Sequence, residues 1–201
     1  GATYFPPKAI GGRPSFRQAL EAIAAQYATK HDDIVQQAEQ LAAHLKQSLS
    51  GTAVGQSAPV PAEAIATVVR FFTDNSDDTW GGLNRAPKFP SSLPTRLMLR
   101  YAHRTGETLP VNVANLALER MAAGGIHDQI GGGFHRYSTD TKWLVPHFEK
   151  MLYDNALLIQ DYVEAWQKTG VEQYANVAKK TLRYVAKELT APGGGFYSAT
   201  D

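Results

Sequence analysis

The chain has 201 residues, which is enough for one large domain or two small ones. Apolar residues make up 43% and charged residues 19%, so the chain can build a packed core and is not intrinsically disordered. The net charge of +1 comes without a basic run, which argues against a nucleic-acid partner.

Two classes of protein are excluded by what the residues lack. No apolar stretch approaches the ~20 residues that a membrane span needs, so we expect no membrane partner. The absence of cysteine excludes disulfides, thiol catalysis and thiolate metal sites within these residues. The opening GATYFPPKAIGG has neither the charged start nor the apolar run of a signal peptide, so we expect a cytoplasmic location. Both ends of the sequence look cut, which predicts a fragment of something longer.

The first elements predicted are a short strand at Ala2–Phe5, stopped by two prolines, and a helix from about 15 to 29. Asp32 or Asp33 can cap a second helix. Its buried stripe would be Ile34, Ala38, Leu41, Leu45 and Leu49. Residues 50–61 are rich in Gly, Ser, Ala and Pro and are interpreted as a linker.

Five further helices are predicted after this linker, at about 62–73, 94–104, 110–123, 148–170 and 172–190. Two prolines around Lys88 and Phe89 hold those two residues in extended backbone before the second of these helices. Phe134–Ser138 is expected to pair with Lys142–Val145 as a short hairpin. The chain is therefore expected to be mainly helical.

A repeated glycine loop organises these helices. Its three copies are Gly81-Gly82-Leu83, Gly132-Gly133-Phe134 and Gly194-Gly195-Phe196. Two helices separate each pair of copies, and a repeated helical hairpin predicts stacked hairpins, either an open solenoid or a closed α/α toroid. In both architectures the loops gather on one rim, which is a natural place for a pocket.

The stretch from Ala122 to Asn155 combines glycine clusters with many chemically active side chains, which favours a functional loop over a structural corner. Asn155 falls on the apolar stripe of its helix and so needs either a partner or a polar cavity. Glu149 can simply favour a helix start, and Lys150 with Asp154 can be a plain surface pair.

Four chemistries are considered for these side chains. His127, His135 and His147 with Asp128 could be metal ligands, but their spacing matches no standard zinc pattern, so we predict no metal and no other cofactor. Hydrogen bonding to a polyol suits the set better, with aromatic rings stacking on a sugar face. A carboxylate pair for glycoside hydrolysis could come from Asp128, Asp140, Glu149, Asp154 and Asp201. Proton abstraction by a histidine beside a carbonyl is equally open.

Three motifs, GGLNRAPKFP, GGIHDQIGGGFHRYSTDTKWLVPHFEKMLYDNALL and GGGFYSATD, resemble the YyaL-type, thioredoxin-domain-containing family that includes spermatogenesis-associated protein 20. The resemblance covers essentially the whole chain. It implies an N-terminal thioredoxin-like domain followed by an (α/α)6 toroid similar to N-acylglucosamine 2-epimerases and six-hairpin glycosidases. On this basis residues 1–30 would be the remnant of the thioredoxin-like domain, 31–60 a connecting helix and linker, and 61–201 the first part of the toroid.

The leading hypothesis is a carbohydrate-active toroid fragment of the sugar epimerase or isomerase type. The expected acid/base residues are His135, His147, Glu149 and Asp154. The expected substrate-binding residues are Lys88, His127, Asp128, Arg136, Tyr137, Asp140, Trp143 and Asn155. The alternatives are a non-catalytic interaction module and a glycoside hydrolase. We also expect the chain to pack against another copy or against the rest of the toroid, because half a toroid exposes apolar helix faces.

Overall fold

The computed structural model describes residues 5–50 and 61–200. Residues 2–4 of the predicted strand, residues 51–60 of the linker predicted at 50–61, and the candidate carboxylate Asp201 lie outside the described residues. The chain divides into two compact units, residues 1–59 and 60–201, and each is described by itself. No helix among the described residues is both long enough and apolar enough to cross a lipid bilayer.

The first unit contains two helices, α1 (Phe16–Thr29) and α2 (His31–Ser50). Ser15 begins α1 with a capping box, since its hydroxyl accepts the N–H of Gln18 while the Gln18 side chain accepts the N–H of Ser15. The predicted cap of the second helix is wrong, because Asp32 and Asp33 lie inside the first turn of α2. Their charge still favours the helix start through the dipole.

The predicted burial of the second helix is also wrong within this unit. Along its stripe Leu41 is 59% exposed, Leu45 50% and Leu49 71%. Two helices that pack on each other bury little surface. An apolar stripe is buried only when a further layer of secondary structure packs against it. The assignment of residues 1–30 to a thioredoxin-like domain stays a prediction.

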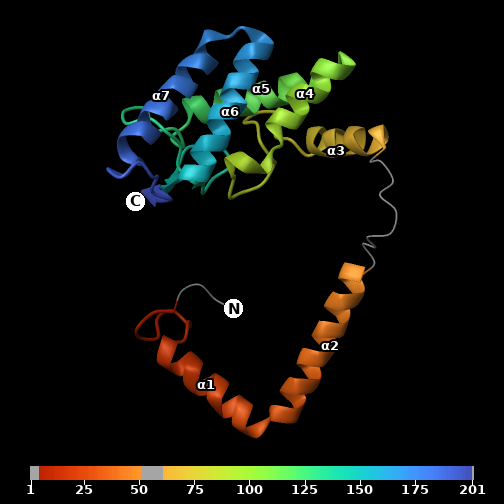
Figure 1. Ribbon diagram of the computed structural model, residues 1–201, viewed down its shortest axis with the longest axis vertical. Coiled ribbons are helices and arrows are strands. Elements are labelled where there is room, and N and C mark those ends of the chain that lie inside the picture. Colours follow the sequence, from red (N-terminus) through yellow and green to blue (C-terminus); the bar gives the residue numbers. More distant parts are fainter. Residues whose placement is uncertain (1–4, 51–60, 201) are drawn as a thin grey trace. The chain divides into compact units, whose positions relative to one another are not determined.

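The second unit is built from five helices, which Figure 1 shows packed beside one another. They are α3 (Ala62–Asp74), α4 (Thr95–Thr105), α5 (Leu109–Ala123), α6 (Leu152–Thr169) and α7 (Glu172–Glu188). A short 3-10 turn, η1 (Pro90–Ser92), precedes α4. Helices α4 and α5 form one hairpin and α6 and α7 the next, and α4 also packs against α6. The helix positions predicted after the linker are confirmed to within a few residues, apart from the start of α6.

One continuous apolar core holds the second unit together. Met98 of α4, Leu118 of α5 and Leu158 of α6 are all nearly inaccessible to solvent. Phe134 and Trp143 extend this core into the loop between α5 and α6. The rim loop is therefore anchored to the helices by its own aromatic side chains.

Two short strand pairs shape the rim. Strand β1 (Tyr137–Ser138) pairs antiparallel with β2 (Pro146–His147), and β3 (Lys150–Met151) pairs antiparallel with β4 (Ala199–Thr200). The hairpin predicted with Lys142–Val145 is thus displaced. Those residues form a loop that Asp140 closes, because its carboxylate accepts the N–H groups of Lys142, Leu144 and Val145 at 2.5, 3.3 and 2.6 Å.

Helix α6 begins at Leu152 and not near Phe148 as predicted. The pairing of Lys150 with Thr200 and of Met151 with Ala199 holds β3 extended, so the helix cannot start earlier. A strand from about fifty residues further along the chain thus decides where this helix begins.

Candidate functional site

The first glycine loop is closed by hydrogen bonds around Asp77. The N–H of Asp77 donates to Gly82 O at 2.9 Å, and the N–H of Gly81 donates to Asp77 O at 2.8 Å. Lys88 Nζ donates to the Asp77 carboxylate at 2.7 Å and to Gly81 O at 2.7 Å. The ring of Trp143 lies 5.5 Å from this ammonium group. We name the Asp77–Lys88 pair the first bridge.

The second glycine loop repeats this arrangement. The N–H of Asp128 donates to Gly133 O at 3.0 Å, and the N–H of Gly132 donates to Asp128 O at 3.0 Å. Lys150 Nζ donates to the Asp128 carboxylate at 2.7 Å and to Gly132 O at 3.0 Å. The ring of Tyr184 lies 4.4 Å from this ammonium group. We name the Asp128–Lys150 pair the second bridge.

The third glycine loop keeps only the backbone part of this design. The N–H of Ala191 donates to Gly195 O at 2.8 Å, so alanine stands where the other loops have aspartate. Sequence reasoning found the glycine pairs but missed Asp77 and Tyr184, and it offered Lys150 only as a possible surface partner of Asp154. An Asp-x3-Gly-Gly spacing shared by the first two loops was the available signal for the carboxylates.

Both bridges carry ionised carboxylates. Burial by itself would raise the pKa of Asp77, but hydrogen bonds from Lys88 and from two backbone N–H groups outweigh burial and lower the pKa. The same balance holds at Asp128, where Lys150 and backbone N–H groups bring the pKa to about 2 despite burial. Both aspartates are therefore negatively charged at neutral pH.

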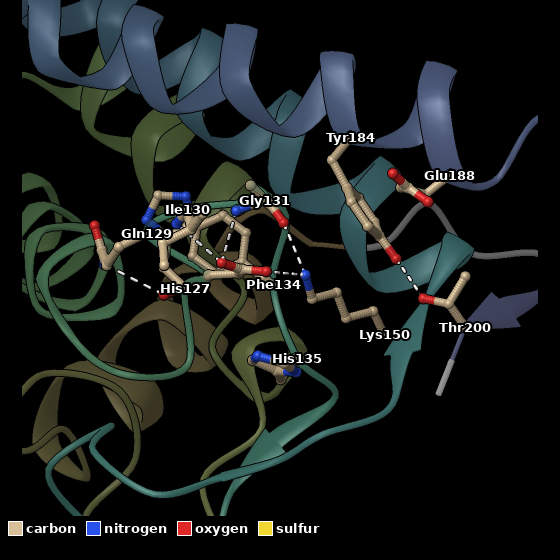
Figure 2. A network of polar contacts seen from close by, with 12 residues as sticks. His127, Gln129, Ile130, Gly131, Phe134, His135, Lys150, Tyr184, Glu188 and Thr200 are labelled. Carbon is tan, nitrogen blue, oxygen red and sulfur yellow. Dashed lines mark hydrogen bonds and ion pairs between the residues drawn. The ribbon is translucent and has the colours of Figure 1, made fainter.

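The two bridges differ in their access to solvent. The side chains of Lys88 and Asp77 are 1% and 11% exposed, whereas those of Lys150 and Asp128 are 10% and 29% exposed. The difference arises because the second bridge opens into a cavity of about 400 Å³. Figure 2 shows several residues that line it, among them His135, Lys150 and Glu188. Its lining residues are Asp128, Gly131, His135, Phe148, Lys150, Tyr184, Glu188 and Thr200. We name this cavity the rim pocket.

His135 is the titratable ring of the rim pocket. Its side chain is largely buried, and Nδ1 lies 3.1 Å from the carbonyl oxygen of Phe148. A carbonyl only accepts hydrogen bonds, so Nδ1 carries the proton of the neutral ring and Nε2 keeps a lone pair. Burial lowers the pKa of His135 below its ordinary value, although the Phe148 carbonyl opposes this, so the ring is neutral at neutral pH. A neutral imidazole with a defined tautomer is suited to act as a general base.

Phe148, Tyr184 and Thr200 complete the pocket. Phe148 is 71% exposed and presents an apolar ring at the opening. The Tyr184 hydroxyl and Thr200 Oγ1 lie 2.5 Å apart and join α7 to β4. The pocket therefore offers an aromatic face together with hydroxyl groups, a combination that suits a polyol.

Three residues predicted to bind substrate are held in the interior instead. Lys88 is 1% exposed in the first bridge, and Trp143 Nε1 donates to Trp80 O at 2.8 Å from a buried position. Asn155 is fully buried, with Oδ1 accepting the N–H of Phe134 at 2.7 Å and Nδ2 donating to Phe134 O at 3.0 Å and Met151 O at 2.9 Å. The cavity interpretation of Asn155 is corrected, since its amide joins the rim loop to the start of α6. Asp140 is likewise engaged in closing its own loop.

A separate group of predicted residues lies along the strand pair β1–β2, outside the rim pocket. Arg136 pairs with Glu149 at 2.9 Å, and the Tyr137 and His147 rings stack with centroids 4.8 Å apart. Asp154 is nearly inaccessible, and burial raises its pKa to about 6, with Arg136 opposing and Glu149 adding to the shift.

The alternative in which Lys150 pairs with Asp154 is wrong. Lys150 precedes the first residue of α6 and forms its ion pair with Asp128. The two residues are therefore not one helical turn apart, as that alternative requires.

The three histidines of the central stretch lie in different surroundings. His127 is buried, with Nδ1 3.1 Å from Ala122 O, and it lines a small cavity of about 130 Å³ beside α7. His135 lines the rim pocket, and His147 is exposed on β2. Within residues 5–50 and 61–200, no three or more His, Asp or Glu groups converge in a way that could hold a metal ion.

A larger cavity of about 580 Å³ lies between α4 and α6 and contains none of the predicted site residues. Its charged side chains are mostly at the surface, and Arg100, which is 64% exposed, is paired with Glu164 at 2.6 Å. The rim pocket is the better candidate because it combines an oriented, largely buried base with a fixed backbone frame.

The chain matches no protein-family model. It is similar along its whole length to spermatogenesis-associated protein 20 of mouse, with 39% identity over 208 residues, and of human, with 39% identity over 207 residues. An uncharacterised protein of Caenorhabditis elegans is 32% identical over 207 residues. The chain spans about a quarter of the length of these curated relatives, 26% of the mouse and human proteins.

Two solved structures resemble the protein in fold. A sugar epimerase from a ruminal bacterium aligns with a TM-score of 0.58 at 18% identity, covering 69% of this chain and 40% of that one. Cellobiose 2-epimerase from Bacillus thermoamylovorans aligns with a TM-score of 0.59 at 15% identity, covering 69% of this chain and 39% of that one. At such identities the likeness concerns the fold alone. The chain is therefore related along its whole length to the spermatogenesis-associated protein 20 family, and its helical hairpins have the fold of part of a sugar-epimerase-type (α/α)6 toroid.

Proposed function

We propose that the rim pocket binds a sugar and that the protein is an enzyme of the sugar epimerase or isomerase type. His135 would be the base that removes a proton from the carbon beside the sugar carbonyl. The observation that carries this proposal is a neutral histidine with a defined tautomer, lining a polar cavity of about 400 Å³. A positioned general base typically contributes about 10²–10⁴-fold to the rate of such a step.

The chemistry of the lining supports a sugar as the ligand. Phe148 offers a ring on which a sugar face can stack, while Thr200 and the Tyr184 hydroxyl offer hydrogen bonds. The charges beside His135 act in opposite directions, since Lys150 disfavours the protonated ring more than Asp128 favours it. The ionised Asp128 would therefore offset part of the repulsion from Lys150 when the imidazolium forms.

The glycoside hydrolase alternative has less support. Hydrolysis needs a protonated carboxylic acid as well as a carboxylate. The carboxylates that line the rim pocket are Asp128, whose pKa is about 2, and the exposed Glu188. Asp154 and Asp161, whose pKa values burial raises to about 6 and about 7, do not line the rim pocket.

The test is hydrogen exchange at carbon 2 of the sugar. The protein would be incubated in D2O with free aldoses, and proton NMR would follow loss of the signal of the proton on carbon 2. We expect exchange with at least one sugar and a loss of about 100-fold or more in His135→Gln. His44→Gln, on an exposed face of α2, changes a histidine elsewhere and is expected to leave the rate unchanged.

Thermal shift with the same sugars separates binding from catalysis, because a ligand that binds the native state raises its stability. Sugar binding without exchange would leave a binding protein and remove the proposed reaction. Neither binding nor exchange, with His135→Gln folding normally, would overturn the proposed function in favour of the non-catalytic interaction module.

A further inference from the structure

We infer that the rim pocket selects sugars without negative charge and prefers a free amino sugar to the corresponding neutral sugar. This inference rests on the proposed function and adds a substrate class to it. It follows from which charges of the pocket are already engaged and which are left to a ligand. The first glycine loop helps to separate the two kinds of charge, because it contains the same lysine–aspartate bridge in a position that solvent hardly reaches.

The ammonium group of Lys150 is not available to an anion. It has three N–H donors, and its surroundings provide the Asp128 carboxylate, the carbonyl oxygen of Gly132 and the Tyr184 ring. Lys88 of the first bridge has the same three kinds of partner and is 1% exposed, where a ligand has no access. The contacts of Lys150 within the loop therefore engage its ammonium group without any ligand.

Helices α5 and α7 occupy equivalent positions against the first two loops. A Cβ added to Gly81 would meet the backbone of Ala117 on α5, and one added to Gly132 would meet the backbone of Lys180 on α7. Eight residues on from each contact stand Gly125, two residues beyond the end of α5, and Glu188, the last residue of α7. The first copy thus has glycine, and the second a carboxylate, close to the end of the helix that packs on the loop.

The two positions differ in what can lie against them. In the first copy the loop that carries Trp143 and Leu144 lies directly on the backbone, since a Cβ on Gly125 would be 2.1 Å from Leu144 O. A side chain at the equivalent position leaves no room for a loop seated in the same way. Figure 2 shows Glu188 and Tyr184 projecting from α7 on the side of the pocket where Thr200 lies.

The lining of the rim pocket therefore has two carboxylates, Asp128 and Glu188, against one ammonium group, Lys150. His135 adds no charge at neutral pH, because burial lowers its pKa. Lys187 contacts Glu188 at 2.6 Å, but the two side chains are 82% and 45% exposed, so this ion pair is weak. The charge left to a ligand is negative, which favours an ammonium group and disfavours phosphate or carboxylate.

The test compares four probes by calorimetry and thermal shift at fixed ionic strength: D-glucose, D-glucosamine, N-acetyl-D-glucosamine and D-glucose 6-phosphate. We expect D-glucosamine to bind about two- to fivefold more tightly than D-glucose, the effect of one partly exposed charge pair, and D-glucose 6-phosphate to bind more weakly. In Glu188→Gln the amine preference should disappear while D-glucose binding is retained. Glu172→Gln, at the other end of α7, makes the same charge change away from the pocket and should keep the preference.

Three results would overturn the inference while leaving the proposed function intact: tighter binding of the phosphate, equal binding of amine and neutral sugar, or an amine preference that survives Glu188→Gln. Binding of none of the four probes, together with no exchange at carbon 2 of any sugar, would overturn the proposed function and this inference with it.

Discussion

Asp154 is a buried carboxyl group, and its Oδ2 has no hydrogen-bond partner among residues 5–50 and 61–200. Burial raises its pKa to about 6, so the native protein holds a proton there that the unfolded chain releases near pH 4. As the pH rises from about 4 through 6, ionisation of this group costs the native state free energy. The native state is therefore more stable when the Asp154 carboxyl is protonated.

A prediction follows for Asp154→Asn, which keeps the shape and removes the ionisation. Relative to wild type, the variant should gain stability as the pH rises from 4.5 to 7.5, by on the order of 2 kcal/mol. Urea unfolding at the two pH values measures this gain, with Asp78→Asn, at an exposed position of the same unit, as control. A variant that loses the same stability at both pH values would mean that Arg136 stabilises the ionised form.

At the scale of elements, each glycine loop is a unit that its bridge and its neighbouring ring hold in place. The glycines are required where the chain approaches a ring closely. Gly82 has φ 71°, and a Cβ there would lie 2.6 Å from the Trp143 ring. Gly133 has φ 75°, and a Cβ there would lie 2.4 Å from the Tyr184 ring. A loop of this shape therefore depends on residues that arrive from the next hairpin.

The two bridges should differ in their contribution to stability. Lys88→Met leaves Asp77 buried without its partner and should cost about 3–5 kcal/mol. Lys150→Met exposes a carboxylate that water can reach, and should cost only about 1–3 kcal/mol. Chemical denaturation of both variants measures the difference, and Asp77→Asn combined with Lys88→Met should recover part of the loss. Equal losses at the two sites would contradict the view that the first bridge is closed and the second open.

At the scale of the whole molecule, large apolar side chains remain exposed on both units. Leu20 of α1 is 51% exposed and Leu45 of α2 is 50% exposed, while Ile130 and Leu144 of the second unit are 100% and 63% exposed. Contiguous exposed apolar surface marks interaction sites. We propose that these surfaces pack against another copy or against further hairpins of a toroid.

The expected consequence is association that increases with protein concentration in sedimentation velocity. Leu20→Lys with Leu45→Lys should shift the protein toward monomer, because each change places a charge on an apolar face. Gln36→Lys with Gln47→Lys adds the same charge at exposed polar positions of α2 and serves as control. A monomer at every concentration would remove the association proposal.

Much of this fold could be predicted from the sequence. The helices of the second unit carry apolar residues at regular spacing, and glycines at 106 and 170, with φ of 81° and 73°, end α4 and α6. These signals are readable because they depend on residues only a few positions apart. The repeat of the glycine loop indicated stacked hairpins, because a pair of helices separates successive copies. The family was recognisable for the same reason, since its motifs are continuous in sequence.

The candidate site could be predicted only in part. Asp128 and His135 were identified because they stand in an unusual stretch, and both line the rim pocket. Lys150 was expected in a helix and Asn155 in a cavity, and both expectations failed because their partners are distant in sequence. Asn155 meets Phe134 across 21 residues, and Lys150 meets Thr200 across 50.

Sequence by itself determined the helical hairpins, the repeated loop and the family, because these depend on local periodicity and continuous motifs. Only the tertiary structure decided which polar groups are left for a ligand. Glu188 has no local signal that connects it to His135, and the two share a pocket because α7 packs beside the rim loop. Whether a charged group supports the fold or faces a substrate depends on what lies within a few ångströms of it, and that is set by packing between hairpins.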